Sequence, residues 1–409
     1  MPDAIVLLFV FAFGACVGSF LNVVVYRLPR GQSLVSPPSR CPRCEHKLAW
    51  YDNVPVLGWV WLGGKCRYCR EPIAARYPIV EALTGSLFVV YWICFFDLHV
   101  GPCSGNPLRA MNVQQDWPVY ALCMFMIAAL LAASLIDFDL FIIPPQIPWL
   151  MAAVGVVVHA IVAAPGRPGT LMVDPPAGAM AAGALVGWLM SLLMLKTGWL
   201  RISFAQGEPM LDIDREAAQQ EIDAARRRGE DPPPLPPVYT RAELRMELVR
   251  EMMFLLPAMV LSGIAVMIVL GVPSIGEAWR NLMSNGWFSG AMGSVLGAMV
   301  GAFVVWVTRI LGTLGFGRLA MGLGDVHLMF GVGAIIGAGA VTVAFFLAPF
   351  AGMAIAVYLM LFGQRREIPY GPYLSLGAAA TLLFYCPIAD WLRPGLTGLG
   401  QVVRGMLGG

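Results

Sequence analysis

Charged side chains are scarce in this sequence. Only 13% of its 409 residues are Asp, Glu, Lys or Arg, while 58% are hydrophobic and the mean hydropathy is +0.72. So few charges cannot cover the surface of an ordinary soluble domain, which excludes that class of protein. The net charge of +2 gives no reason to expect a nucleic-acid partner. The composition predicts an all-α polytopic membrane protein in a lipid bilayer.

The first apolar run lacks the small-residue cleavage site of a secretory signal peptide. Residues 4–26 are long enough to span a bilayer, and basic residues follow them. We therefore expect residues 1–26 to remain as the first transmembrane helix. Gly18, Ser19 and Asn22 recur at helical spacing in this run, so they form either a packing face against another helix or a pocket for a ligand.

Residues 27–78 are rich in basic side chains, with nine Lys or Arg against three acids. This excess places the segment in the cytoplasm and the N-terminus outside. Two Cys-x-x-Cys pairs lie here, Cys41 with Cys44 and Cys66 with Cys69. Their spacing predicts a tetracysteine domain that binds one structural zinc ion, and the alternative of two disulfides fits a cytoplasmic segment poorly. The other five cysteines lie in or near apolar runs and are expected to be packing residues: Cys16, Cys94, Cys103, Cys123 and Cys386.

The rest of the chain divides into apolar runs of membrane-spanning length and one polar segment. We expect about ten transmembrane helices, with membrane regions at 79–198 and 252–409 on either side of a cytoplasmic insertion at 199–251. The fourth helix is expected to begin near Phe141, with prolines kinking its first turns. The long apolar run after residue 325 is expected to divide near residues 337–340 into a short helix and a longer one.

The insertion at 199–251 is charged and proline-rich. Residues 211–228 read as a surface helix, and the proline run at 231–237 should be extended. Thr240 and Glu243 have the spacing of a capping box that starts a helix leading into the membrane. We expect most of this insertion to be solvated and to take no part in the chemistry.

Two acids stand at the ends of apolar runs. Asp137 closes the third predicted helix, and Asp325 follows Gly322 and Gly324, whose missing side chains let a backbone or an extended peptide approach. An ionisable group at membrane depth is costly and usually functional, so the two acids are candidates for a catalytic pair. Glu81, near the start of the second helix, is either a capping or snorkelling acid or a polar partner facing the same cavity.

Four stretches in this order resemble one protein family. They are GSFLNVVVYRLP at 18–29, the paired Cys-x-x-Cys segment, Ile136-Asp137 with Pro144, and GLGD at 322–325 with IPYGP at 368–372. Together they resemble the bacterial type IV prepilin peptidases, the leader peptidase/N-methyltransferase family of GxGD-type aspartic membrane peptidases. The resemblance excludes residues 165–288, where the insertion and an extra helix pair lengthen the spacing between the two acids. His327 and Pro145-Gln146 depart from the family pattern, and we interpret His327 as a boundary residue.

The resemblance implies a membrane aspartic endopeptidase that removes the leader peptide of type IV prepilins or pseudopilins on the cytoplasmic side of the bacterial inner membrane. It implies Asp137 and Asp325 as the catalytic pair, one carboxylate taking a proton from water while the other, protonated, polarises the scissile carbonyl. We place four further residues in supporting positions: Asp139, Gly322, Gly324 and Glu81. The resemblance also implies N-methylation of the new N-terminus with S-adenosylmethionine, of which nothing in the composition gives a sign.

Two other functions use the same pair of acids. A proton- or ion-coupled carrier would bind cations between Asp137 and Asp325. A presenilin-like intramembrane protease shares the Gly-x-Gly-Asp motif but has a Tyr-Asp first motif, whereas here Phe138 follows Asp137. The tetracysteine domain argues against both alternatives.

Overall fold

The computed structural model describes residues 2–41, 43–102, 111–204, 223, 239–317, 319–361 and 369–407. Within these ranges the chain is mainly helical and forms no strand beyond two isolated bridges, Arg40 with Lys47 and Lys65 with Pro72. Eight helices of the described chain are long and apolar enough to cross a membrane, and α5 is a shorter apolar helix among them. The expected class, an all-α polytopic membrane protein, is confirmed.

The helices divide between the two halves of the chain. The first half forms α1 (Pro2–Arg27), η1 (Leu28–Arg30), η2 (Trp50–Asn53), α2 (Leu57–Trp61), α3 (Arg76–Trp92), its π-helical continuation η3 (Ile93–Asp97), α4 (Val113–Leu140), α5 (Gln146–Val162) and α6 (Pro175–Lys196). The second half forms α8 (Arg241–Gly271), α9 (Pro273–Met283), α10 (Gly286–Phe316), α11 (Leu323–Leu361) and α12 (Gly371–Leu407).

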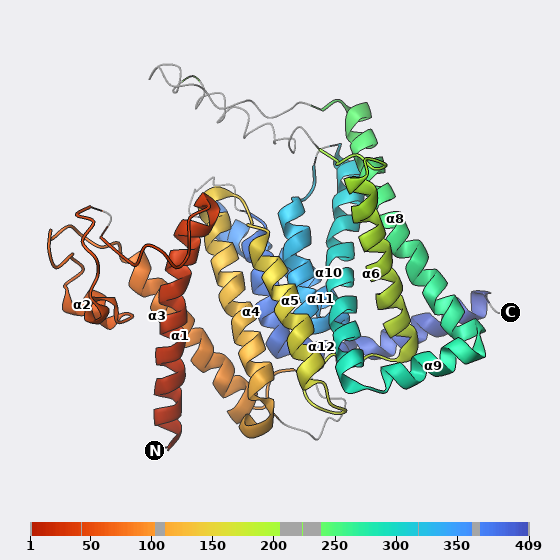
Figure 1. Ribbon diagram of the computed structural model, residues 1–409, viewed down its shortest axis with the longest axis horizontal. Coiled ribbons are helices and arrows are strands. Elements are labelled where there is room, and N and C mark those ends of the chain that lie inside the picture. The colour runs from red at the N-terminus through yellow and green to blue at the C-terminus, as the bar shows by residue number, and fades with distance from the viewer. Residues whose placement is uncertain are drawn as a thin grey trace.

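Three groups of helices lie side by side in Figure 1. Helices α1 and α3 flank one side, next to the cysteine domain formed by residues 27–75. Helices α4, α5, α10, α11 and α12 form the centre, and α6 and α8 form the other flank. We call the end at which α4 finishes and α11 begins the upper end, as in Figure 1, and the other the lower end. Helix α9 and the last part of α12 run across the lower end.

Helices α1 and α3 approach each other closely at the flank next to the cysteine domain. A Cβ on Gly18 of α1 would lie 2.8 Å from the Cα of Glu81 on α3, and the Asn22 side chain donates a hydrogen bond to the Tyr77 carbonyl at 3.2 Å. Small residues let membrane helices approach in this way. The packing interpretation of Gly18 and Asn22 is therefore confirmed, and the ligand-pocket alternative is not needed.

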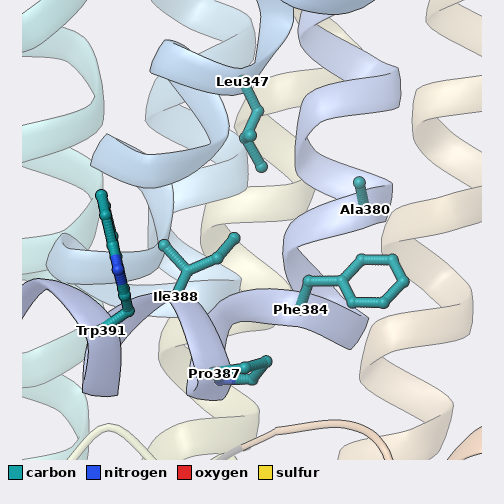
Figure 2. Close-up of a pocket in the computed structure, with 6 residues that line it drawn as sticks. All are labelled: Leu347, Ala380, Phe384, Pro387, Ile388 and Trp391. Carbon is teal, nitrogen blue, oxygen red and sulfur yellow. The ribbon is translucent and has the colours of Figure 1, made fainter.

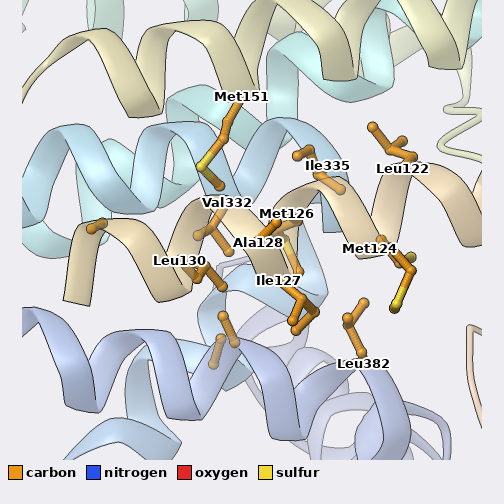
Figure 3. Packing of buried hydrophobic residues seen from close by; sticks show 14 of the residues in the cluster. Leu122, Met124, Met126, Ile127, Ala128, Leu130, Met151, Val332, Ile335 and Leu382 are labelled. Atoms are coloured by element: carbon orange, nitrogen blue, oxygen red, sulfur yellow. The ribbon is translucent and has the colours of Figure 1, made fainter. Parts of the chain in front are cut away.

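The central helices share one continuous apolar cluster (Figure 3). Its buried side chains come mainly from α4 and α11, with further members from α12, α5, α1 and α3. Those labelled in the figure are Leu122, Met124, Met126, Ile127, Ala128, Leu130, Met151, Val332, Ile335 and Leu382. This packing fixes α4 against α11 and α12 through the middle of the bundle. The ends of these helices are thereby fixed as well.

Several predicted boundaries are confirmed. Helix α11 is broken at Gly337, whose φ of 83° and ψ of 171° are not helical, so the expected division near residues 337–340 is correct. Thr240 and Glu243 form the expected capping box, which starts α8. The surface helix predicted at 211–228 and the proline run at 231–237 lie outside the described residues, apart from Asp223.

Two expectations are wrong. Helix α5 begins at Gln146 rather than near Phe141, because Phe141 ends α4 in a left-handed conformation (φ 55°, ψ 32°). The prolines stand before this helix or in its first turn, where a missing N–H breaks no helical hydrogen bond, so they start the helix instead of kinking it.

Cys386 is disulfide-bonded and is not merely a packing residue. Of the other four, Cys123 is buried, Cys94 half-buried and Cys16 exposed, and Cys103 lies outside the described residues.

Candidate active site and cysteine cluster

Asp137 lies in the last turn of α4, and its residue surface is only 5% exposed. Its carboxylate accepts a hydrogen bond from the backbone amide of Gly371, the first residue of α12. A Cβ at Gly371 would lie 2.5 Å from the Asp137 Oδ2 atom, so only glycine permits this approach. The N-terminus of a helix favours a negative charge, which makes the start of α12 a suitable place for this carboxylate.

Asp325 lies in the first turn of α11 and is 8% exposed. A Cβ at Gly322 would be 3.7 Å from the Asp325 Oδ2 atom, so the glycine leaves this side of the carboxylate uncovered by a side chain. Burial raises the pKa of Tyr370 to about 12, and the nearby negative charge of Asp325 adds to the effect. The Tyr370 phenol therefore keeps its proton at neutral pH and remains a hydrogen-bond donor.

The two acids gather at the same place, around Tyr370 and Gly371 at the upper end of the bundle. Ile143, from the segment between α4 and α5, lies close to glycines near both acids. A Cβ on Gly324 would be 3.2 Å from the Ile143 Cβ, and a Cβ on Gly371 would be 3.0 Å from the Ile143 Cδ1. The end of α4 and the starts of α11 and α12 thus converge. Two buried carboxyl groups arranged in this way are suited to general acid and base chemistry.

Two other residues that we placed in supporting positions lie elsewhere. The Asp139 carboxylate forms an ion pair with Arg76 at 2.7 Å, and both side chains are more than 40% exposed. Glu81 accepts a hydrogen bond from the Val56 amide at 2.6 Å and one from the Ser19 side chain. Asp139 therefore links α4 to the start of α3, and Glu81 links the membrane helices to the cysteine domain, so neither joins the pair of acids.

His327, which we interpret as a boundary residue, contacts an aromatic side chain of α5. Its ring centroid lies 6.3 Å from that of Trp149 on α5. Tyr370 and Gly371, by contrast, received no role from the sequence beyond their place in a motif. The Pro-Tyr-Gly-Pro sequence was the available signal, but only the fold places it against both acids.

Cys41, Cys44, Cys66 and Cys69 form one cluster, with all four Sγ atoms within 4.8 Å of one another. The Sγ atoms of Cys41 and Cys69 are 3.8 Å apart, and those of Cys44 and Cys66 are 3.9 Å apart. A tetrahedral zinc ion with Zn–S bonds of about 2.3 Å requires sulfur atoms roughly 3.8 Å apart. The four thiols therefore fit such an ion, and all four are free cysteines.

The backbone of each Cys-x-x-Cys pair is folded in the same way. The residue after each pair, Glu45 or Arg70, has a left-handed φ of 57° or 59°, and its amide bonds to the carbonyl of the first cysteine. Backbone hydrogen bonds from Cys69 and Tyr68 lower the pKa of Cys66 to about 7. These amides favour the thiolate form, which is the form that binds metal.

A separate apolar hollow of about 470 Å³ lies between the second part of α11 and α12 (Figure 2). It is lined by Leu347, Ala380, Phe384, Pro387, Ile388 and Trp391 and contains neither acid nor cysteine. Phe384 and Pro387 are neighbours of Cys386 near the middle of α12, away from its first residue, Gly371. The hollow is therefore not part of the acid site.

Comparison with known proteins links this chain to one family. Residues 12–95 match the family model described as the bacterial peptidase A24 N-terminal domain. A Myxococcus xanthus protein named prepilin leader peptidase/N-methyltransferase is 61% identical over 80 residues, which are 20% of this chain and 24% of that protein. Proteins of the same name from Klebsiella pneumoniae and Burkholderia pseudomallei are 47% identical over 88 residues (20% of this chain, 39% of the relative) and 36% identical over 172 residues (36% and 50%).

The matches thus cover half or less of these relatives' own length. No solved structure matches the chain. The family model covers most of α1, the cysteine domain and α3, but neither acid. The resemblance found in the sequence is confirmed over residues 12–95, which match the bacterial peptidase A24 N-terminal domain.

Proposed function

We propose that this protein is a membrane aspartic endopeptidase that removes the leader peptide of type IV prepilins or pseudopilins, with Asp137 and Asp325 as its catalytic pair. The observation that supports this most directly is the convergence of two buried carboxyl groups on the start of α12. The names of the relatives that match the N-terminal part supply the substrate class.

The reaction would begin with one carboxyl group ionised and the other protonated. The ionised carboxylate takes a proton from water as the water oxygen attacks the scissile carbonyl carbon, while the protonated acid donates a hydrogen bond to the carbonyl oxygen. When the tetrahedral intermediate collapses, the C–N bond breaks and the leaving nitrogen receives a proton from the acid pair. The Gly371 amide holds Asp137, and the Tyr370 hydroxyl lies near Asp325 as a further donor.

We further propose that the cysteine domain and the acids face the cytoplasm and that the lower end faces outward. Four free thiols suit a reducing compartment, whereas a disulfide persists in an oxidising one. Cys386, which is disulfide-bonded, lies against the Gly101 carbonyl at 3.2 Å, beyond the end of η3. The basic excess of residues 27–78 supports the same orientation.

The cofactors of this proposal are a structural zinc ion and S-adenosylmethionine. Cys41, Cys44, Cys66 and Cys69 would hold the zinc ion, which would stabilise the cysteine domain and leave no open coordination position for catalysis. N-methylation of the newly exposed N-terminus, with S-adenosylmethionine as the methyl donor, is supported by the names of the relatives alone.

The decisive experiment is cleavage of a purified prepilin by the purified protein in detergent. Asp137→Asn and Asp325→Asn should each abolish cleavage, because Asn cannot exchange a proton, and the double variant should be no worse than either single one. Asp139→Asn is the matched control and should retain activity, because its half-exposed ion pair contributes only about 0–1 kcal/mol.

Three outcomes separate the proposed function from its alternatives. Cleavage within the membrane segment of a substrate, instead of at the leader junction, would favour the presenilin-like protease. Proton-coupled uptake into vesicles without any cleavage would favour the carrier. Full cleavage by either Asp137→Asn or Asp325→Asn would remove that residue from the mechanism.

A further inference from the structure

Arg309 and Glu251 form an ion pair that is almost completely removed from solvent. Each side chain is 1% exposed, and they join α10 to α8. The guanidinium Nε donates to both carboxylate oxygens of Glu251 at 3.1 and 3.3 Å, and the Trp306 indole N–H donates to the same carboxylate at 2.9 Å. Buried ion pairs add little net stability and are costly at membrane depth, so a pair of this kind calls for a functional explanation.

The guanidinium of Arg309 also reaches the segment that leads to Asp325. Its Nη1 atom donates a hydrogen bond to the carbonyl oxygen of Met321, four residues before Asp325. One turn further along α10, the Thr313 hydroxyl accepts a hydrogen bond from the Ala320 amide at 3.1 Å. Two side chains of α10 thus hold residues 320 and 321, directly before α11 begins at Leu323.

The surroundings of Arg309 hold its guanidinium in one orientation. The Phe204 ring lies 5.3 Å from the guanidinium carbon, and the Phe204 amide donates to Glu247 at 2.8 Å, one turn before Glu251 on α8. Helix α8 packs chiefly on α6, outside the central group (Figure 1). Through Glu251, this outer helix contacts Arg309, which in turn bonds to the segment before Asp325.

We propose that Arg309 and Glu251 are positioning residues for Asp325. Arg309 fixes the approach to α11 through the Met321 carbonyl, and Glu251 fixes the Arg309 guanidinium. This inference rests on the proposed function, because it assigns α8 a part in aligning one of the two proposed catalytic acids. Arg309→Lys keeps the positive charge but removes the planar guanidinium that bonds to the Met321 carbonyl and the Glu251 carboxylate at the same time. Glu251→Gln keeps the shape of the side chain but removes its negative charge.

Arg309→Lys and Glu251→Gln test the inference, with Arg245→Lys on the exposed face of α8 and Glu277→Gln on α9 as matched controls. For a prepilin substrate, kcat should fall on the order of tenfold to a hundredfold in both test variants, because a small misplacement of a catalytic group is costly. KM should stay within about twofold, since Asp325 rather than the substrate contacts is displaced. The combined variant should be no worse than Arg309→Lys alone, because both act through one contact.

Hydrogen exchange gives a readout that does not depend on activity. The peptide that contains Ala320 should exchange faster in Arg309→Lys and Glu251→Gln than in the wild type, while the peptide around Asp137 should not change. Unchanged exchange at Ala320, or faster exchange with an unaltered kcat, would overturn the inference. If Glu251→Gln does not fold, Trp306→Phe replaces it, because it removes only one donor to the carboxylate.

The wild type and Asp325→Asn are measured in the same assay. A wild type that does not cleave prepilin refutes the proposed function, and the exchange of Ala320 then decides alone whether the ion pair holds this segment. A wild type that cleaves, together with control-like values for both test variants, refutes only the positioning role.

Discussion

Two adjacent residues, Tyr370 and Gly371, connect the two halves of the candidate site. The Gly371 amide bonds to Asp137, and its neighbour Tyr370 lies within the electrostatic reach of Asp325. The close approach of the Asp137 carboxylate to this amide requires that position 371 has no side chain. Adding a single methyl group at this position should therefore disturb the site.

Gly371→Ala should impair cleavage while the protein still folds. The new Cβ would stand 2.5 Å from the Asp137 Oδ2 atom, which ends a side chain that can rotate away, so the carboxylate should be displaced. We expect kcat to fall at least tenfold, equivalent to about 1.4 kcal/mol of transition-state stabilisation. Steady-state kinetics and thermal unfolding measure the two effects. Gly352→Ala is the control, because its Cβ would meet Tyr373 at an ordinary 3.4 Å; equal activity of the two variants would contradict the prediction.

The cysteine domain depends on elements too short to be stable alone. Its helix α2 has five residues, and apart from two isolated bridges its described part has no sheet. Arg67, inside the second Cys-x-x-Cys pair, binds both oxygens of the buried Asp52 at 3.0 and 3.1 Å and so fastens that pair to η2. Small domains of this kind need a metal or a similar cross-link to fold.

Replacing both Cys41 and Cys66 by Ser should therefore remove the metal and unfold this domain before the membrane helices are affected. Structural zinc supplies roughly 10 kcal/mol or more of folding free energy in small domains. Metal analysis should find one zinc ion per chain in the wild type and none in the double variant, and limited proteolysis should cut residues 30–75 first. Cys16→Ser with Cys94→Ser is the matched control. A wild type without zinc would exclude the site.

The sequence predicted helices better than it predicted their ends and partners. Hydropathy located the long helices, and Gly337 marked the break in α11, because these features are local. The start of α5 was predicted wrongly because Phe141 adopts a left-handed conformation, which is rare for a residue other than glycine and gives no signal in the sequence. Asp137 and Asp325 were recognised as charges in apolar runs, and Arg309 carried the same signal. What Arg309 binds could not be predicted, since its partners Glu251 and Met321 are brought to it by the packing of three helices.

In the whole molecule, the charged insertion leaves and returns at nearly the same point. The rings of Phe204 and Tyr239 lie 5.5 Å apart, so the segment between them begins and ends in contact. The Phe204 amide donates a hydrogen bond to Glu247, and both residues are buried. The anchored residues therefore lie outside the part of the segment that looks solvated in the sequence.

Deletion of residues 206–236 should change the rate of prepilin cleavage by no more than about twofold. The temperature of thermal unfolding should stay within about 1–2 °C of the wild-type value. Closing a short loop costs little, and the remaining residues need only bridge two rings already in contact. Expression, membrane insertion and cleavage are compared with the full chain. The counterpart is a deletion of 200–236, which removes Phe204 and should lower activity; if the shorter deletion is as harmful, the insertion has a function of its own.

The disulfide of Cys386 and the four free thiols of the cysteine domain impose opposite requirements on any buffer that contains this protein. A thiol reductant added to keep the four thiols reduced can also attack the disulfide, whereas an oxidant that preserves the disulfide can join unprotected thiols. Binding of a metal ion would protect these thiols, because the thiolate that would otherwise react is then a metal ligand. We therefore expect a stock purified with zinc and without reductant to keep both the cysteine cluster and the disulfide intact.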